Sequence, residues 1–264
     1  MTDSPLTAET KADFSAIYSG PDPRAYYRAL QPLDYQVPAH ALPVVEGVLD
    51  GRPVLDLCCS YGTNAALLRT SVDLAGLTAR YTDPALADLS PVELADADAA
   101  FFAAHRRRDV RMLGLDASGP AVTYAGRAGL LDAAFAEDLE TGDPSPALAA
   151  ALADVGTIVC TGGVGYVGPA TFTRLLAHVP PDVRLVVFVL RVFAYDAIAE
   201  VVAAHGLTTQ KRPGTVRQRR FADTAEQAAA VADVAARGLD PEGREAAGWF
   251  HAECFVSIPR PGTG

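Results

Sequence analysis

The chain has 264 residues, of which 50% are hydrophobic and 20% are charged. This composition predicts a folded globular protein and excludes a disordered chain. The net charge of −10 disfavours a nucleic-acid partner, because neutralisation of phosphates dominates the affinity of such complexes. Apolar runs such as Leu185 to Leu190 are too short to span a bilayer, so no membrane association is expected.

None of the cysteines has the spacing of a zinc site; they are Cys58, Cys59, Cys160 and Cys254. Residues 1–12 are expected to be a frayed polar tail, without the pattern of a signal peptide. We therefore expect a cytoplasmic protein with reduced cysteines and no metal. Assembly into a homo-oligomer is left open.

The first 49 residues are expected to form a helical cap. Asp22-Pro23 supplies an N-cap and a first-turn proline for a helix over 24–30, and a second helix is expected over about 39–49. Tyrosines concentrate in this region, at Tyr18, Tyr26, Tyr27 and Tyr35. They either close over a binding site or serve packing alone.

A strand, a tight turn and a helix are predicted between Gly51 and Thr70. Val54 and Leu55 form a short apolar run that ends at Asp56, and Gly62 opens an amphipathic helix. This is the arrangement that binds nucleotide-like cofactors at a helix N-terminus.

Residues 71–109 are predicted to be a helical insertion. Ser90-Pro91-Val92-Glu93 is a capping box with proline at the first helical position. The apolar stripe that follows has helical spacing, at Leu94, Ala97, Phe101 and Ala104. The insertion could serve packing alone, but we expect it to act, together with residues 18–35, as a mobile lid over a pocket.

From Val110 onward, strands alternate with helices. Strands are predicted at 110–116, 133–136, 157–160, 184–190, 207–210, 216–221 and 249–258. With the Val54 strand, this alternation predicts a single α/β domain over 1–264, with its core at 50–70 and 110–264. We expect a doubly wound, mostly parallel, Rossmann-like sheet of seven strands with an antiparallel terminal strand.

Acidic residues stand at successive strand ends. Asp56, Asp116 and Asp138 end three of the predicted parallel strands, and Thr161 ends a fourth. A ligand of such a sheet lies across these carboxyl ends. A carboxylate at the second strand end can bind both ribose hydroxyls, and one at the third can accept from an adenine amino group.

These segments resemble the motifs of class I S-adenosylmethionine-dependent methyltransferases. The turn from Asp56 to Gly62 is similar to the first motif, acid-x-Gly-x-Gly-x-Gly, with Cys58 and Ser60 in place of two glycines. Residues 113–118 resemble the second motif, 136–139 the third, and Thr161-Gly162 the fourth. The resemblance implies S-adenosylmethionine as cofactor. The implied contacts are Tyr27, Asp56, Cys58, Ser60, Gly62, Asp116, Ala117, Ser118, Glu137, Asp138, Leu139, Thr161 and Gly162.

Asp83 is a rival to Asp116 for the ribose, because it follows Asp56 at a shorter distance in the sequence. It follows no apolar strand, and residues 81–84 have the composition of a turn. We therefore favour Asp116.

The resemblance implies transfer of a methyl group to a small acceptor. An antiparallel last strand would bring His251 near Arg191 and Tyr195, where it could deprotonate the acceptor, although a structural role for this histidine stays open. His251, Tyr166 and Arg191 are the catalytic candidates. Aromatic residues around them suggest an aromatic or hydrophobic metabolite, methylated on carbon, nitrogen or oxygen.

Two other functions stay open. One is a protein of the same fold that binds the cofactor without turnover. The other is an NAD(P)-dependent oxidoreductase, which is disfavoured because the chain lacks a Tyr-x-x-x-Lys pair and because the first turn, after Asp56, lacks Gly-x-Gly-x-x-Gly.

Overall fold

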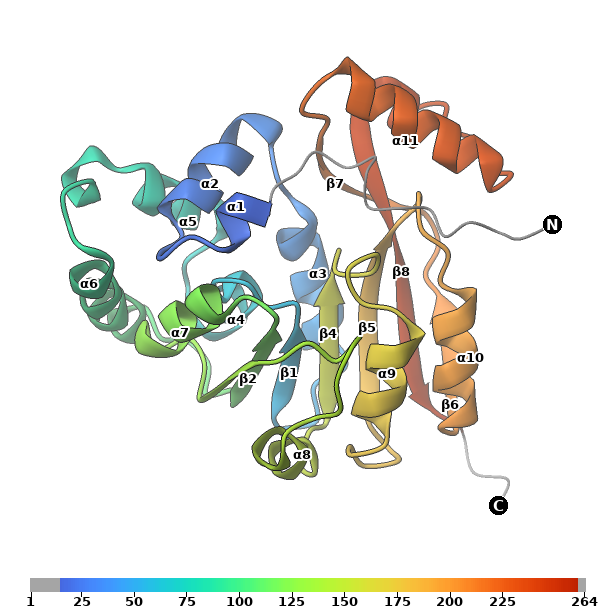
Figure 1. Cartoon of the computed structure of the whole chain (residues 1–264), viewed down its shortest axis with the longest axis horizontal. Coiled ribbons are helices and arrows are strands. Elements are labelled where there is room, and N and C mark those ends of the chain that lie inside the picture. The colour runs from blue at the N-terminus through green and yellow to red at the C-terminus, as the bar shows by residue number, and fades with distance from the viewer. Residues whose placement is uncertain (1–14, 261–264) are drawn as a thin grey trace.

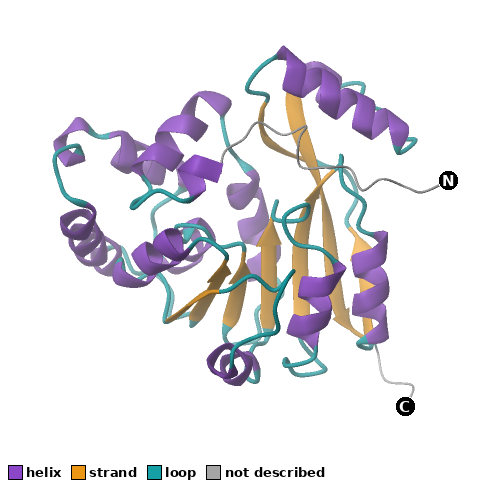
Figure 2. Cartoon of the chain, viewed as in Figure 1, coloured by secondary structure: helices purple, strands orange, loops and turns teal. Residues whose placement is uncertain are grey.

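The computed structural model describes residues 15–260, so the tail expected over 1–12 lies outside the described residues. Its centre is one mixed sheet with helices on both faces (Figure 1, Figure 2). The strands are β1 (Val54–Leu57), β2 (Met112–Asp116), β3 (Ala133–Ala136), β4 (Thr157–Thr161), β5 (Arg184–Leu190), β6 (Leu207–Lys211), β7 (Val216–Arg220) and β8 (Trp249–Pro259).

The strand order is β3-β2-β1-β4-β5-β8-β6, and β7 also pairs with β8. The pairs among β1 to β5 are parallel, whereas β8 runs antiparallel to β5, β6 and β7. The expected doubly wound sheet with an antiparallel terminal strand is confirmed. The order reverses between β1 and β4, and a ligand of an open α/β sheet binds at such a reversal.

The expected number of strands was wrong, because the sheet has eight strands instead of seven. β6 pairs with the second half of β8, as in Lys211 against Phe255, and β7 pairs with its first half, as in Val216 against Ala252. One long strand therefore holds two short ones in succession. β8 also lies inside the sheet, between β5 and β6, and not at its edge.

Both faces of the sheet are buried, which explains the continuous apolar runs of its strands. Leu55 and Leu57 of β1 belong to one core cluster, with α8 (Pro146–Leu152), α9 (Pro169–Leu176) and α10 (Asp196–Ala204). Val54 belongs to the other cluster, with α3 (Val37–Glu46), α4 (Thr63–Arg69), α7 (Gly119–Arg127) and α11 (Thr224–Ala236). Asp56 shares the face of Val54, because side chains alternate along a strand.

The N-terminal cap consists of α1 (Ser15–Tyr18), α2 (Arg24–Leu30), the 3₁₀ turn η2 (Gln31–Leu33) and α3. Figure 1 shows α1 and α2 beyond the end of the sheet to which the arrow of β4 points. Tyr61, in the turn after β1, fastens the cap by donating its hydroxyl to the carbonyl oxygens of Ile17 and Gly20, at 2.9 and 3.0 Å.

The insertion contains α5 (Leu74–Thr82), the 3₁₀ turn η3 (Pro84–Leu86) and α6 (Pro91–Ala104). The capping box forms as expected, with Ser90 and Glu93 bonded to each other's backbone. The predicted stripe differs from the buried face of α6, which consists of Leu94, Ala95, Asp98 and Phe102.

Asp98 explains the shift of the buried face. This fully buried carboxylate accepts hydrogen bonds of 2.6 Å from Arg80, Tyr81 and Tyr124. A charged residue on an apolar face has no periodic signal, and these three donors stabilise its burial. The insertion is thereby fixed to α7.

The last short element before β8 is the 3₁₀ turn η4 (Glu245–Ala247). Among the helices of 15–260, none has the length and apolar character needed to cross a membrane.

Candidate functional site

The turn after β1 has an unusual backbone. Cys58 and Ser60 have φ angles of 59° and 48°, and Gly62 has a φ of 80°. All three positions at which the methyltransferase motif has glycine are therefore left-handed, although two of them carry side chains. Such a conformation costs a non-glycine residue about 1–2 kcal/mol, and strain of this kind concentrates at binding sites. The turn thus has a left-handed backbone at Cys58 and Ser60 as well as at Gly62.

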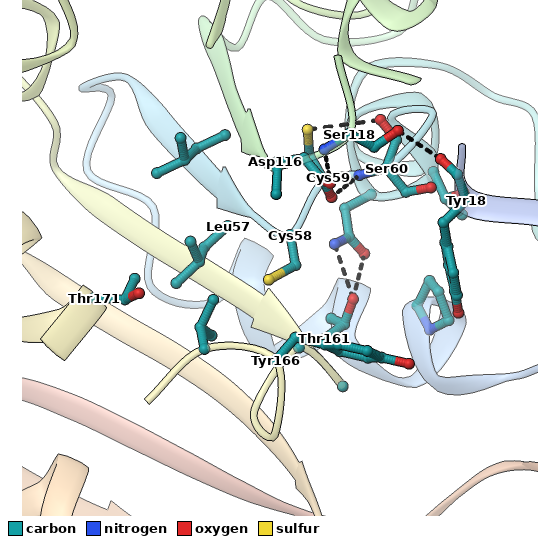
Figure 3. Close-up of a pocket in the computed structure, with 18 of the residues that line it drawn as sticks. Tyr18, Leu57, Cys58, Cys59, Ser60, Asp116, Ser118, Thr161, Tyr166 and Thr171 are labelled. Atoms are coloured by element: carbon teal, nitrogen blue, oxygen red, sulfur yellow. Dashed lines mark hydrogen bonds between the residues drawn. The ribbon is translucent and has the colours of Figure 1, made fainter. Parts of the chain in front are cut away.

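Asp116 at the end of β2 holds this turn. Its Oδ2 accepts the N–H of Ser60 and its Oδ1 accepts the N–H of Ser118, both at 2.9 Å (Figure 3). Burial raises the pKa of Asp116 above its ordinary value, although the two N–H groups act to lower it. Each carboxylate oxygen can accept a second hydrogen bond, so Asp116 retains the capacity to bind a pair of hydroxyls.

A cavity of about 380 Å³ opens along the carboxyl ends of β1, β2 and β4, within the size range of small-molecule sites. Its lining comes from the cap, the turn after β1, and the loops after β2, β3 and β4. The lining residues are Tyr18, Ser19, Tyr26, Tyr35, Pro38, Leu57, Cys58, Cys59, Ser60, Thr63, Asn64, Leu115, Asp116, Ala117, Ser118, Glu137, Asp138, Leu139, Thr161, Gly162, Gly163, Tyr166, Val167, Thr171 and Gln218.

At one end of the cavity, which we call the β3 end, are Asp116, Glu137, Asp138 and Leu139. Glu137 accepts the N–H and the hydroxyl of Ser145, the N-cap of α8, at 2.8 and 2.7 Å. Asp138 accepts from the N–H of Glu140 and the hydroxyl of Thr141, both at 2.9 Å. Both carboxylates are thus oriented by the loop between β3 and α8.

At the other end, which we call the β7 end, Tyr26 and Tyr35 of the cap meet Gly162, Tyr166 and Gln218, while Tyr18 lies between the two ends, close to both Tyr166 and Asp116. The ring centroids of Tyr18 and Tyr26 are 5.5 Å apart, and those of Tyr26 and Tyr35 are 6.3 Å apart. Burial raises the pKa of each of these three phenols, so their hydroxyls stay protonated near neutral pH.

Asn64, on the first turn of α4, links the two central strands. Its Nδ2 donates to Asp56 Oδ1 at 2.8 Å and to Thr161 Oγ1 at 3.0 Å. Asp56 is fully buried behind Asn64 and does not line the cavity, and its Oδ2 has no partner among the described residues. Burial, reinforced by Asp116 and opposed by the hydrogen bond from Asn64, raises the pKa of Asp56 to about 7.

The two thiols in the turn, those of Cys58 and Cys59, are weakly acidic. Hydrogen bonding with Cys160 and burial raise the pKa of Cys58 well above its usual range. Cys58 lines the cavity as a neutral thiol, without the lowered pKa of a nucleophile.

Of the cofactor contacts implied by the resemblance, Tyr27, Asp56 and Gly62 do not line the cavity, whereas the others do. Tyr27 shares a 2.9 Å hydrogen bond with Thr63, and its ring stacks on Tyr81. Gly62 acts through its backbone conformation, and a Cβ there would come within 3.3 Å of Ala125. Asp83 also lies outside the lining, where it accepts the N–H of Ala85.

The three catalytic candidates do not lie together at the cavity. Tyr166 lines the cavity and is 53% exposed, whereas His251 and Arg191 lie outside the lining. The N–H of Arg191 does donate to the carbonyl of His251 at 3.0 Å, as the antiparallel strand predicted. The guanidinium, however, is buried in a 2.5 Å ion pair with Glu245.

His251 has a partner away from the cavity, since its Nδ1 bonds to the hydroxyl of Thr215 at 2.9 Å. Burial, together with Arg244, Arg191 and Arg217, lowers its pKa to about 4. Tyr195, the N-cap of α10, does not lie beside His251 as expected. Its ring stacks on Phe255, farther along β8, with the ring centroids 4.2 Å apart. We therefore leave His251 and Arg191 out of the proposed site.

Several lining residues could not be predicted from the sequence motifs, notably Asn64 and Gln218. Asn64 has a signal in retrospect, because it stands on the first helical turn after Gly62, where a side chain faces the strand ends. Gln218 has none, because its position depends on how β7 pairs with β8. Within residues 15–260, no group of three or more His, Cys, Asp or Glu residues could hold a metal ion.

No protein-family model matches the sequence, and no curated protein matches it. Several solved structures do resemble the chain. The Burkholderia thailandensis 1,6-didemethyltoxoflavin-N1-methyltransferase, solved with 1,6-didemethyltoxoflavin and S-adenosylhomocysteine, is 14% identical with a TM-score of 0.48, over 98% of this chain and 93% of that one.

A chain of the complex between the Haloferax volcanii Trm112 methyltransferase activator and the putative methyltransferase is 15% identical with a TM-score of 0.48, over 97% and 100% of the two chains. A TehB-like SAM-dependent methyltransferase from Corynebacterium glutamicum is 14% identical with a TM-score of 0.44, over 83% and 87%. At identities of 14–15% these likenesses concern the fold alone.

Proposed function

We propose that this protein is an S-adenosylmethionine-dependent methyltransferase that acts on a small aromatic or hydrophobic metabolite. The observation that carries the proposal is the joint geometry of Asp116 and the left-handed turn after β1. The carboxylate holds the turn through Ser60 and still has capacity for two hydroxyl donors.

The residues at the β3 end and in the turn fit the cofactor. Asp116 would bind the ribose hydroxyls, and Asp138 with Leu139 would hold the adenine. Ser60 Oγ is buried without a partner among the described residues and lies at the cavity, so a polar group of the methionine portion would satisfy it. Cys58 and Gly62 would shape the turn around that portion.

When bound, the cofactor supplies a sulfonium methyl group that an acceptor attacks in line. The chain's own part is to orient the two reactants and to exclude water. Thr161 and Gly162, at the end of β4, would line the position of the transferred methyl group. Tyr166 would orient the acceptor from the loop that follows, and the tyrosines of the cap would cover it.

Equilibrium titration tests the proposal. By calorimetry, the purified protein should bind S-adenosylhomocysteine, the product of methyl transfer, and should not bind NAD. Binding of NAD without binding of S-adenosylhomocysteine would contradict the assignment. A screen of aromatic acceptors with radiolabelled S-adenosylmethionine then distinguishes an enzyme from a protein that binds the cofactor without turnover.

A further inference from the structure

Gln218 reaches the cavity because β7 is irregular. Arg217 pairs with His251 and Arg219 pairs with Phe250, so Gln218 is an extra residue without a partner in the ladder. Its carbonyl instead accepts the N–H of Gln36, the N-cap of α3, at 2.7 Å. Such bulges re-aim side chains and are frequent next to active sites.

The carboxamide of Gln218 is buried at the cavity without a hydrogen-bond partner for its oxygen. The residue is only 5% exposed and lines the cavity, and its Oε1 is unpartnered among the described residues. A buried polar atom in this state costs about 1–3 kcal/mol, which a bound donor would recover. The side chain therefore points to a ligand.

Gln218 is also close to the end of β4. Gly162 follows Thr161 and has a φ of 78°, and a Cβ at Gly162 would lie 2.8 Å from Gln218 Nε2. The amide thus lies against the loop that would line the transferred methyl group. It is on the opposite side of β1 from Asp138, so a ligand of Gln218 and an adenine at the β3 end would not compete.

The surroundings of Gln218 are aromatic and uncharged. The lining residues of the β7 end include Tyr26, Tyr35 and Tyr166, and none of the lining residues at this end has a carboxylate, an ammonium, an imidazole or a guanidinium. The neighbouring Arg219 is held by both carboxylate oxygens of Glu226, at 2.8 and 2.7 Å. This environment favours flat, neutral rings over ions.

We infer that Gln218 recognises the substrate that receives the methyl group. This substrate is an uncharged planar ring whose edge carries a hydrogen-bond donor next to a hydrogen-bond-accepting oxygen, as in a lactam. A carboxamide presents one acceptor oxygen and one donor nitrogen side by side, so a cyclic amide complements it with two hydrogen bonds. This inference rests on the proposed function and specifies its substrate class.

Quinolin-2(1H)-one is a suitable probe, since it has two fused rings and an N–H adjacent to its carbonyl. Calorimetry with protein saturated with S-adenosylhomocysteine should detect its binding. Gln218→Met, which keeps the length of the side chain, should weaken that binding about tenfold or more, because both hydrogen bonds are lost. 1-Methylquinolin-2-one, which lacks the N–H, should bind the wild-type protein about as weakly as quinolin-2(1H)-one binds Gln218→Met.

Gln210→Met is the matched control, because Gln210 is exposed on β6 away from the cavity. It should leave the affinity for the lactam unchanged. If Gln218→Met does not fold, Gln218→Glu is the second variant, since it keeps the shape of the side chain and removes its donor. Affinity for S-adenosylhomocysteine, expected to stay within about twofold of wild type, reports on folding in either case.

The outcomes are distinguishable. If S-adenosylhomocysteine does not bind the wild-type protein, the proposed function fails, and this inference fails with it. If it binds, but the lactam does not bind or binds equally to wild type and Gln218→Met, only the role of Gln218 is overturned.

Discussion

Ser118 donates its hydroxyl to the carbonyl oxygen of Tyr18 at 2.6 Å, although the two residues are 100 positions apart. The bond ties the last turn of α1 to the loop that follows β2 (Figure 3). Ser118 also donates its N–H to Asp116, so one residue connects the cap with the proposed ribose ligand.

The cap should therefore respond to the cofactor, and the insertion should not. In hydrogen exchange, amides of 18–35 should gain protection when S-adenosylhomocysteine binds, and amides of 71–109 should stay unchanged, because only the former segment lines the cavity. Ser118→Ala should reduce the gain. Protection gained equally by both segments would support the alternative that the insertion is a lid.

Asp116→Asn should weaken binding of S-adenosylhomocysteine by roughly 2–4 kcal/mol, because a charged acceptor of two hydroxyl bonds is lost. Asp83→Asn is the control, since Asp83 caps η3 outside the cavity, and its affinity should match the wild type. Calorimetric titration measures both. The ribose assignment would be refuted if Asp83→Asn had the larger effect.

Ser60→Gly should raise the free energy of unfolding by about 1 kcal/mol relative to Ser60→Ala, because glycine adopts the φ of 48° without strain. Both variants remove the unpartnered Oγ, so both should lose the same affinity for the cofactor product. Urea denaturation and calorimetry give the two quantities. Equal stability of the two variants would show that the turn relaxes around a Cβ.

Asp56 should make stability depend on pH. Its pKa in the folded protein, about 7, lies above the ordinary value of 3.8. The folded state therefore holds a proton that the unfolded state loses, and stability is full below about pH 4 and falls as the pH rises towards 7. Relative to Asp56→Asn, the wild type should lose roughly 2–4 kcal/mol over that window in urea titrations. A difference that is constant with pH would contradict the raised pKa.

His251 should make stability depend on pH in the opposite direction from Asp56. Its pKa is lowered to about 4 from 6.5, so its contribution to stability is present above about pH 6.5 and is lost as the pH falls towards 4. NMR titration should find its imidazole neutral at pH 6. His251→Gln should remove this acid loss and leave the affinity for S-adenosylhomocysteine unchanged. Loss of that affinity would return His251 to the site.

The strand-end acids and the turn after β1 could be predicted from the sequence. Parallel strands bring their carboxyl ends to one edge, so Asp116 and Asp138 come to one cavity whatever the packing around them. The turn could be predicted from the strand–turn–helix pattern of 54–62, although its backbone is held from β2, by Asp116 through Ser60 and by Leu115 through Cys58. The prediction of a site at these strand ends depended on the order and spacing of the acidic residues more than on the first motif, in which two glycines are replaced.

The tertiary structure decided what depends on contacts between distant segments. Asp98 is on the buried face of α6 because three donors from elsewhere surround it, and Arg191 is outside the cavity because Glu245 binds it. Gln218 enters the cavity only through the shifted register of β7 against β8. Such positions depend on strand pairing and charge pairing between distant segments, so they cannot be predicted from the periodicity of a single segment.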